Sequence, residues 1–170
     1  MRLFIAIPLE ETMKQTLLRI QEGFRDQGVK GTYTPKQNMH LTLAFIGEYG
    51  DPEEVADVLE RIDFQPFRLE LSGTGCFGDL WWAGLKESRE LETLVKKVRR
   101  ALGDAGIPFD RKKFRAHITL LRRAAAPHGI DLSRLPHSAA SSTVDGFCLM
   151  QSTRGKSGMI YTELSRVPAR

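Results

Sequence analysis

The chain has 170 residues, of which 41% are hydrophobic and 27% are charged, and its net charge is +4. This composition is typical of a folded globular protein and excludes a disordered chain. The length allows one full core or two small lobes packed together, and we expect a single domain over residues 1–170. The mild positive charge is compatible with an anionic substrate or a nucleic acid but does not identify one.

The chain carries no pattern typical of secretion or of a membrane protein. Its two cysteines, Cys76 and Cys148, make neither a disulfide framework nor a zinc spacing. The apolar stretch at residues 2–7 is too short for a signal peptide. No stretch approaches the roughly 20 apolar residues of a spanning helix. We therefore expect a cytoplasmic protein with reduced thiols.

The elements of the first half are predicted from the spacing of apolar residues. Residues 2–7 should form a buried strand, and a helix should follow to about residue 27, ending at Gly28. The helix is indicated by apolar residues at helical spacing, which are Met13, Leu17, Ile20 and Phe24. A short strand near residues 30–34 leads into a longer strand that ends at Gly47.

The second half is predicted to alternate between helices and strands. One helix begins at Asp51-Pro52, with proline near its first position, and another spans about residues 88–102. A loop is expected over residues 124–136. The strands of this half are predicted at residues 67–77, 80–85, 142–152 and 159–166.

One short pattern occurs twice, about half a chain length apart. Residues 40–43 and 117–120 both read His-x-Thr-Leu, and they use two of the four histidines. Because side chains alternate along a strand, the histidine and threonine of each copy should share one face. The residues of the opposite face should lie in a core, and these are Leu41, Leu43 and Phe45 in the first copy and Ile118 and Leu120 in the second.

The repeated pattern predicts one shared site. If the two strands face each other, His40, Thr42, His117 and Thr119 surround one phosphate-sized space. Two imidazoles can give and take protons near neutral pH, and two hydroxyls can donate to anionic oxygens. A lone histidine on a strand is more often structural, but the repetition with the same aliphatic pattern favours a functional site. The recurrence of helix, strand and motif also indicates a weak internal duplication.

At these residues the sequence resembles the 2H phosphoesterase superfamily, and within it the RNA 2′,3′-cyclic phosphodiesterases, formerly called 2′-5′ RNA ligases. The resemblance covers nearly the whole chain. Ala116 departs from the family pattern, which has proline there. The matching segments are residues 2–7, 38–47, 80–85 and 114–122, together with Ser152, Gly158, Tyr161 and Leu164.

The resemblance implies a fold and a set of roles. The fold is an α+β, bilobal arrangement of two antiparallel sheets related by a pseudo-twofold axis, with helices outside and a central cleft. His40 would be the proton donor to the leaving ribose oxygen, and His117 would be the proton acceptor that activates water. Thr42 and Thr119 would hold the phosphate oxygens. The residues alone leave the two histidine roles exchangeable.

Three further features of the sequence each leave two interpretations open. The resemblance implies that Arg122 binds phosphate, but strand alternation puts it on the face opposite His117 unless the strand bulges. One of Trp81 and Trp82 should be in the core, and the other could line the cleft. The basic segment Lys112, Lys113, Phe114 and Arg115 could contact RNA, or it could be a solvated loop with one buried aromatic residue.

Metal and nucleoside triphosphate sites are not expected. A catalytic zinc site needs about three protein ligands, and only two histidines stand in the motifs. His128 and His137 lie in proline-rich, loop-like sequence where an exposed position is expected. Gly155-Lys156-Ser157 resembles the end of a P-loop, but Met150 occupies the position of the required glycine. Arg154 and Lys156 could still contribute charge near the cleft.

We therefore predict metal-independent hydrolysis of an RNA or nucleotide 2′,3′-cyclic phosphate to a 2′-phosphomonoester, without a cofactor. The chain is expected to act as a monomer without a stable protein partner. Two alternatives remain open at this stage. One is an RNA- or nucleotide-binding module without turnover. The other is a related activity of the same site on another phosphodiester, including 2′-5′ ligation.

Overall fold

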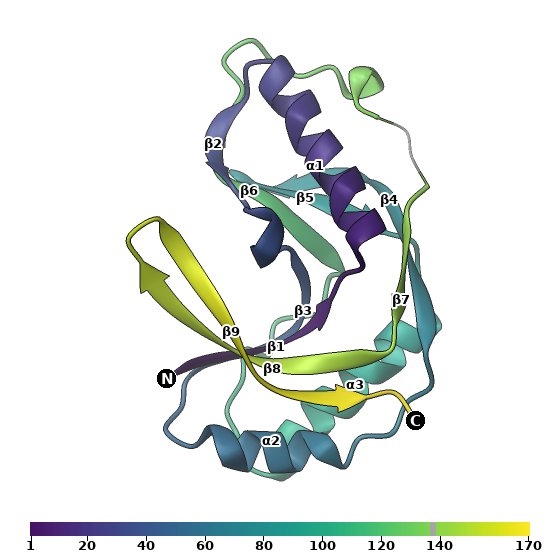
Figure 1. Cartoon of the computed structure of the whole chain (residues 1–170), viewed down its shortest axis with the longest axis vertical. Coiled ribbons are helices and arrows are strands. Elements are labelled where there is room, and N and C mark those ends of the chain that lie inside the picture. The colour runs from purple at the N-terminus through teal and green to yellow at the C-terminus, as the bar shows by residue number, and fades with distance from the viewer. Residues whose placement is uncertain (137–138) are drawn as a thin grey trace.

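Two antiparallel sheets and three α-helices make up the parts of the chain that the computed structural model describes, residues 1–136 and 139–170 (Figure 1). His137 lies outside these residues, so its predicted exposure stays a prediction. The four-stranded sheet has the order β3-β1-β8-β9, and the five-stranded sheet has the order β2-β6-β5-β4-β7. The predicted α+β fold of two antiparallel sheets is confirmed.

The strands are close to those predicted from the sequence. The four-stranded sheet contains β1 (Arg2–Pro8), β3 (His40–Glu48), β8 (Gly146–Gly155) and β9 (Gly158–Pro168). The five-stranded sheet contains β2 (Lys30–Tyr33), β4 (Phe67–Phe77), β5 (Leu80–Leu85), β6 (His117–Ala125) and β7 (Ser141–Val144). The two His-x-Thr copies therefore begin one strand in each sheet.

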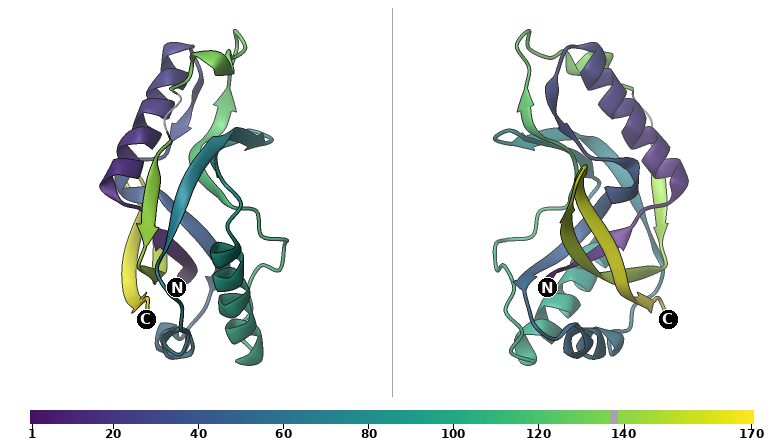
Figure 2. Two further views of the ribbon diagram at one scale, coloured as in Figure 1. Left: turned by 90° about the vertical axis from the view of Figure 1, so that its right-hand side faces the viewer. Right: turned by 60° about the vertical axis from the view of Figure 1, so that its left-hand side comes forward.

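The three helices cover the outer faces of the sheets (Figures 1 and 2). Helix α1 (Glu11–Asp26) follows a strand of the four-stranded sheet but lies on the five-stranded sheet. Helices α2 (Pro52–Glu60) and α3 (Arg89–Asp104) pack at the four-stranded sheet. The side chains of Asp51 and Ser88 accept backbone N–H bonds and so cap α2 and α3.

The same strand–helix–strand unit occurs twice. In the first unit β1 is followed by α1 and pairs with β3, and in the second β5 is followed by α3 and pairs with β6. The register is also the same, because His40 pairs with Pro8 and His117 pairs with Gly84 at the corresponding ends. Helices α1 and α3 each pack on the sheet opposite to the one that holds the strand before them, so the chain passes between the two sheets within each unit.

The predicted strand over residues 142–152 is wrong as one element. The chain breaks at Asp145 into β7, which pairs with β4, and β8, which pairs with β1 and β9. The physical reason is that this segment passes from one sheet to the other, and one straight strand cannot pair in both. The loop predicted for residues 124–136 contains a short 3-10 helix, η2 (Leu132–Arg134), and another, η1 (Lys36–Asn38), precedes β3.

The burial predicted for Phe45 is also wrong. Leu41 and Leu43 are buried as predicted, but the side chain of Phe45 is 48% exposed. Along the ladder Ala6 pairs with Thr42 and the next residue, Ile5, pairs with Ala44, so Leu43 is left unpaired between them. Such a β-bulge reverses the alternation of faces beyond it. Phe45 consequently lies on the same side as His40 and Thr42.

Two predicted features of the whole chain can be compared with the described residues. Cys76 is exposed, Cys148 is buried, and both are free. None of the helices in the described segments has the length and apolar character needed to cross a membrane.

Candidate active site

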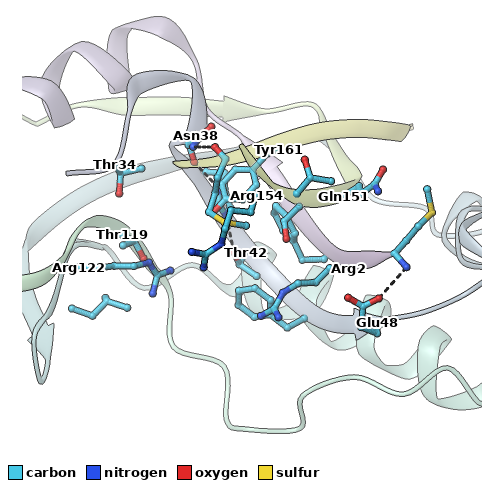
Figure 3. A pocket seen from close by; sticks show the side chains of 18 of the residues that line it. Arg2, Thr34, Asn38, Thr42, Glu48, Thr119, Arg122, Gln151, Arg154 and Tyr161 are labelled. Carbon is cyan, nitrogen blue, oxygen red and sulfur yellow. Dashed lines mark hydrogen bonds and ion pairs between the residues drawn. The ribbon is translucent and has the colours of Figure 1, made fainter. Parts of the chain in front are cut away.

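A cavity of about 800 Å³ lies between the two His-x-Thr strands. Its lining comes from β3 and β6 and from β1, β8 and β9 of the four-stranded sheet (Figure 3). The structure brings all five residues predicted for phosphate chemistry to this cavity, namely His40, Thr42, His117, Thr119 and Arg122.

The imidazole of His40 is held at both nitrogen atoms. Its Nδ1 lies 2.7 Å from the backbone oxygen of Asn38, and its Nε2 lies 2.8 Å from the Thr42 hydroxyl. Because a carbonyl oxygen can only accept, Nδ1 carries hydrogen and donates it to Asn38. In the neutral ring Nε2 therefore accepts the hydroxyl proton of Thr42, and Nε2 is the atom that can take or give a proton.

His117 is held in the same way in the other lobe. Its Nδ1 lies 2.6 Å from the backbone oxygen of Arg115, two residues earlier, as with Asn38 and His40. The same argument makes Nδ1 the donor and leaves Nε2 available for chemistry. Strand geometry thus fixes one tautomer in both copies of the motif.

Aromatic rings support each imidazole, but the sets differ. The His40 ring contacts Phe4 and Tyr161, with centroids 5.0 and 5.2 Å away. The His117 ring contacts Phe77 edge-on at 5.1 Å, and Trp82 lies 6.3 Å away. These contacts restrict the rotation of both imidazoles.

The environment of His40 favours its neutral form. Burial lowers the pKa of His40 from its ordinary value of 6.5, and the positive charges of Arg122 and His117 lower it further. The hydrogen bond to Asn38 opposes this shift. An anion in the cavity would act in the opposite direction, because it stabilises the charged imidazole.

A bulge explains the position of Arg122. Trp82 pairs with Thr119, but its neighbour Trp81 pairs with Leu121, so Leu120 is the unpaired residue in β6. The alternation of faces reverses there, and Arg122 joins His117 and Thr119 on the cavity side. Figure 3 shows Arg122 beside Thr119 in the cavity. Of the two interpretations of Arg122, its position at the site is the one that the structure favours.

Two more cations line the cavity. Arg2 comes from β1 and Arg154 from β8, and both are labelled in Figure 3. Within the described part of the chain neither they nor Arg122 form an ion pair. The carboxylate of Glu48 is also in the lining, but it pairs with the N-terminal ammonium at 3.0 Å. The cavity therefore favours an anion.

Sequence reasoning identified some of these lining residues and missed others. Arg154 was considered as nearby charge, whereas Arg2 gave no indication because it stands beside the N-terminus and far from both motifs. The roles of Asn38 and Phe77 beside the histidines were also missed. The recurring backbone contact two residues before each histidine depends on the strand entry, which the motif itself does not encode.

The two tryptophans lie on opposite faces of the five-stranded sheet. Trp81 packs edge-on against Phe24 of α1, with centroids 5.1 Å apart, and belongs to the core side of the sheet. Trp82 lies on the other face, against Phe77 and His117. Neither ring is part of the cavity lining. Trp82 pairs with Thr119 and therefore flanks the site from the neighbouring strand. The interpretation that one tryptophan lines the cleft is not supported by the cavity lining.

Among the described residues, no three His, Cys, Asp or Glu side chains are grouped as a metal site. His128 is exposed and lies next to Gly28, away from the cavity lining. The basic segment 112–115 lies in a neighbouring hollow that shares His117 with the cavity.

Comparisons with known proteins give a consistent result. A family model described as LigT-like phosphoesterase matches residues 7–80 and 84–161. The RNA 2′,3′-cyclic phosphodiesterase of Archaeoglobus fulgidus is 33% identical, over 96% of this chain and 98% of the relative. The protein of the same name from Thermus thermophilus is 35% identical, over 100% and 91% of the two chains.

Solved structures agree with the sequence comparisons. The crystal structure of Escherichia coli LigT in apo form superposes with a TM-score of 0.85 at 27% identity, covering 99% of this chain and 96% of that one. The same protein complexed with 3′-AMP gives a TM-score of 0.84 at 28% identity, with 99% and 97% covered. The resemblance noted from the sequence is confirmed, and this chain belongs to the LigT-like phosphoesterase family.

Proposed function

We propose that this protein hydrolyses 2′,3′-cyclic phosphate ends of RNA or nucleotides to 2′-phosphomonoesters, without a metal ion. The observation that carries the proposal is the pair of histidine–threonine couples, one from each lobe, on one cation-lined cavity. The family and the names of relatives that cover nearly the whole chain support the same substrate.

The proposed site places the phosphorus between the two imidazoles. His117 Nε2 takes a proton from a water molecule, whose oxygen attacks phosphorus opposite the 3′ oxygen. The bond between phosphorus and the 3′ oxygen breaks, and the protonated His40 Nε2 gives its proton to that oxygen. The 2′ ester bond remains, and proton exchange with solvent restores His40 and His117 for the next turnover. Each proton transfer is worth on the order of 10²–10⁴ in rate.

The threonines and arginines complete this proposal. Thr42, Thr119 and Arg122 donate hydrogen bonds to the non-bridging oxygens, where negative charge accumulates in the transition state. In the free protein the Thr42 hydroxyl is bonded to His40 Nε2. When substrate binds, that hydroxyl turns to a phosphate oxygen, and Nε2 becomes free to meet the 3′ oxygen. The anionic substrate also raises the pKa of His40, so that Nε2 is protonated before it gives its proton to the 3′ oxygen.

The function is tested with a 2′,3′-cyclic nucleotide in the presence of EDTA, with the product separated from its 3′-phosphate isomer. The wild-type protein should form the 2′-phosphate. His40→Ala and His117→Ala should each lose about 10²–10⁴ in kcat. The matched control is His128→Ala, since this exposed histidine lies outside the cavity lining.

Three results would contradict the proposal. Strict dependence on added metal would exclude the metal-independent reaction. Full activity of either motif variant would remove the histidines from the chemistry. Tight nucleotide binding without turnover by the wild type would favour a binding module instead.

A further inference from the structure

A second hollow, of about 520 Å³, adjoins the catalytic cavity and shares Thr42, Phe45 and His117 with it. We call it the side groove and define it by Phe45, Phe77, Arg99, Lys112, Lys113 and Arg115. The mechanism proposed above uses none of these six side chains.

Two partly exposed aromatic rings lie in the side groove. Phe45 is 48% exposed and Phe77 is 37% exposed, and they are the two phenylalanines among the large exposed apolar side chains of the described residues. The bulge in β3 is what turns Phe45 outward, and the Phe77 ring meets His117 at 5.1 Å. Exposed phenylalanine next to a catalytic group offers a stacking surface for a nucleobase.

The other side of the groove is cationic. Lys112, Lys113 and Arg115 are exposed, and none of them forms an ion pair with the described residues. The nearest carboxylate in the lining, that of Asp110, accepts the backbone N–H of Lys112 at 3.0 Å. Of the three, Arg115 lies over the Phe77 ring, 5.8 Å from its centroid. Unpaired cations and exposed aromatic rings in one hollow are the combination found in grooves for single-stranded nucleic acid.

The cationic segment is fixed in place before any ligand arrives. Arg99 from α3 donates from Nη1 to the backbone oxygen of Lys112 at 2.7 Å. The backbone N–H of Asp110 donates to the backbone oxygen of Phe45 at 2.8 Å. These bonds join the segment to α3 and β3, so binding there costs little ordering of the backbone. This fixed geometry argues against a freely solvated loop.

We propose that the side groove binds the RNA strand on the 5′ side of the terminal cyclic phosphate, so that the preferred substrate is an oligoribonucleotide. The proposal rests on the proposed function. In such a substrate the chain continues from the ribose that carries the cyclic phosphate, and it must leave the cavity beside the histidines. The side groove begins there, at Thr42 and His117. Its cations meet the backbone phosphates of the upstream nucleotides, and its rings meet their bases.

The first experiment compares two substrates with the same terminal base, a 2′,3′-cyclic mononucleotide and a pentaribonucleotide ending in a 2′,3′-cyclic phosphate. We expect kcat/KM for the pentamer to exceed that for the mononucleotide by at least about tenfold, as one stacked base would give. The double variant Lys112→Ala/Lys113→Ala should lower this ratio by about tenfold. Lys30→Ala/Lys97→Ala is the matched control, because it removes the same charge from exposed residues outside both hollows and should keep the wild-type ratio.

The second experiment does not need turnover. Binding of a fluorescent pentaribonucleotide with a 3′-phosphate is measured by anisotropy over a series of salt concentrations. Loss of two phosphate contacts should reduce the slope of log K against log salt by about 1.4 in Lys112→Ala/Lys113→Ala. The control double variant should keep the wild-type slope.

The outcomes separate the groove from the proposed function. Equal kcat/KM for the two substrates, or an unchanged ratio in Lys112→Ala/Lys113→Ala, would overturn the groove proposal. If Phe45→Leu lowers kcat/KM by the same factor for both substrates, the ring holds the terminal base, which also overturns it. Absence of turnover on both substrates would overturn the proposed function. The anisotropy slopes alone would then test whether the side groove binds RNA.

Discussion

At the scale of single residues, the two imidazoles have the same backbone partner but different surroundings. His40 and His117 each donate from Nδ1 to a carbonyl two residues earlier, which leaves Nε2 of both rings for proton transfer. His40 is in addition bonded to Thr42 and packed against Phe4 and Tyr161, which also contact each other. Burial and neighbouring positive charge then keep His40 neutral to a lower pH than usual. The proposed role of His40 as proton donor therefore relies on the substrate anion to raise the pKa of the ring.

This difference predicts how His40 titrates. Because its pKa is lowered, the ring should stay neutral as the pH falls through 6.5 and should take up its proton only at lower pH. Bound nucleotide 2′-phosphate should move the pKa of His40 upward. Titration of the histidine C–H signals by NMR, with His40→Gln to assign the resonance, measures both values. A free-protein pKa at or above 6.5, or no upward movement with ligand, would contradict this account of the site.

The pH dependence of catalysis should follow from the same pair. The profile of kcat/KM should be bell-shaped, since one imidazole must carry a proton while the other must lack it. The two apparent pKa values belong to the pair, and because burial lowers the pKa of His40 the acid-side limb should lie below the ordinary value of 6.5. A profile that rises or falls in one direction only would exclude paired acid and base catalysis.

At the scale of elements, the two bulges decide which side chains reach the cavity. In both β3 and β6 the residue directly after the threonine is unpaired, and the side chain five residues after each histidine turns to the cavity side. In β3 that residue is Phe45, and in β6 it is Arg122. The duplicated strands therefore give the cavity a ring from one lobe and a cation from the other.

These bulges also show where the sequence ceases to predict the site. Alternation correctly placed each histidine with its threonine and buried Leu41 and Ile118, because those residues precede the irregularity. It failed for Phe45 and left Arg122 undecided, because a bulge is a property of the pairing between two strands. Nothing in the local sequence of β3 or β6 states which residue its partner will leave unpaired. The 3.6-residue spacing of α1 and α3 involves no partner register, and both helices were predicted within about two residues.

Substitution of Gly75 in β4 tests how much the site depends on the position of Trp82. A Cβ at Gly75 would overlap the six-membered ring of Trp82, whose centroid lies 6.3 Å from that of His117. Gly75→Ala should therefore lower the free energy of unfolding by about 1–3 kcal/mol and lower kcat/KM as His117 loses its support. The control is Gly103→Ala at the end of α3, where nothing lies within 4 Å and up to about 1 kcal/mol of stabilisation is expected.

Chemical denaturation and steady-state kinetics measure the effects of the two alanine substitutions. Gly75→Ala with wild-type stability and wild-type kcat/KM would show that the indole is free to move and that His117 does not depend on it. A large loss in Gly103→Ala would instead mean that any added methyl group disturbs the fold.

At the scale of the whole molecule, the cavity exists because each of the two sheets presents one His-x-Thr strand to it. The crossing of α1 and α3 to the opposite sheets, and the passage of the chain between sheets at Asp145, bind the lobes together (Figure 1). The repeated motif indicated the two lobes and their shared site. It did not indicate the break at Asp145, because the sequence around it reads as one continuous strand and only the presence of two sheets divides it.

The central claim is that the two lobes perform different halves of one proton exchange at one phosphorus atom. The most direct test is a nucleoside 2′,3′-cyclic phosphate with sulfur in place of the 3′ oxygen, because a thiolate leaves without being protonated. On this substrate His40→Ala should lower kcat by less than about tenfold, while His117→Ala should still lower kcat by about 10²–10⁴. Equal defects of the two variants on the oxygen and sulfur substrates, or rescue of His117→Ala in place of His40→Ala, would contradict the account.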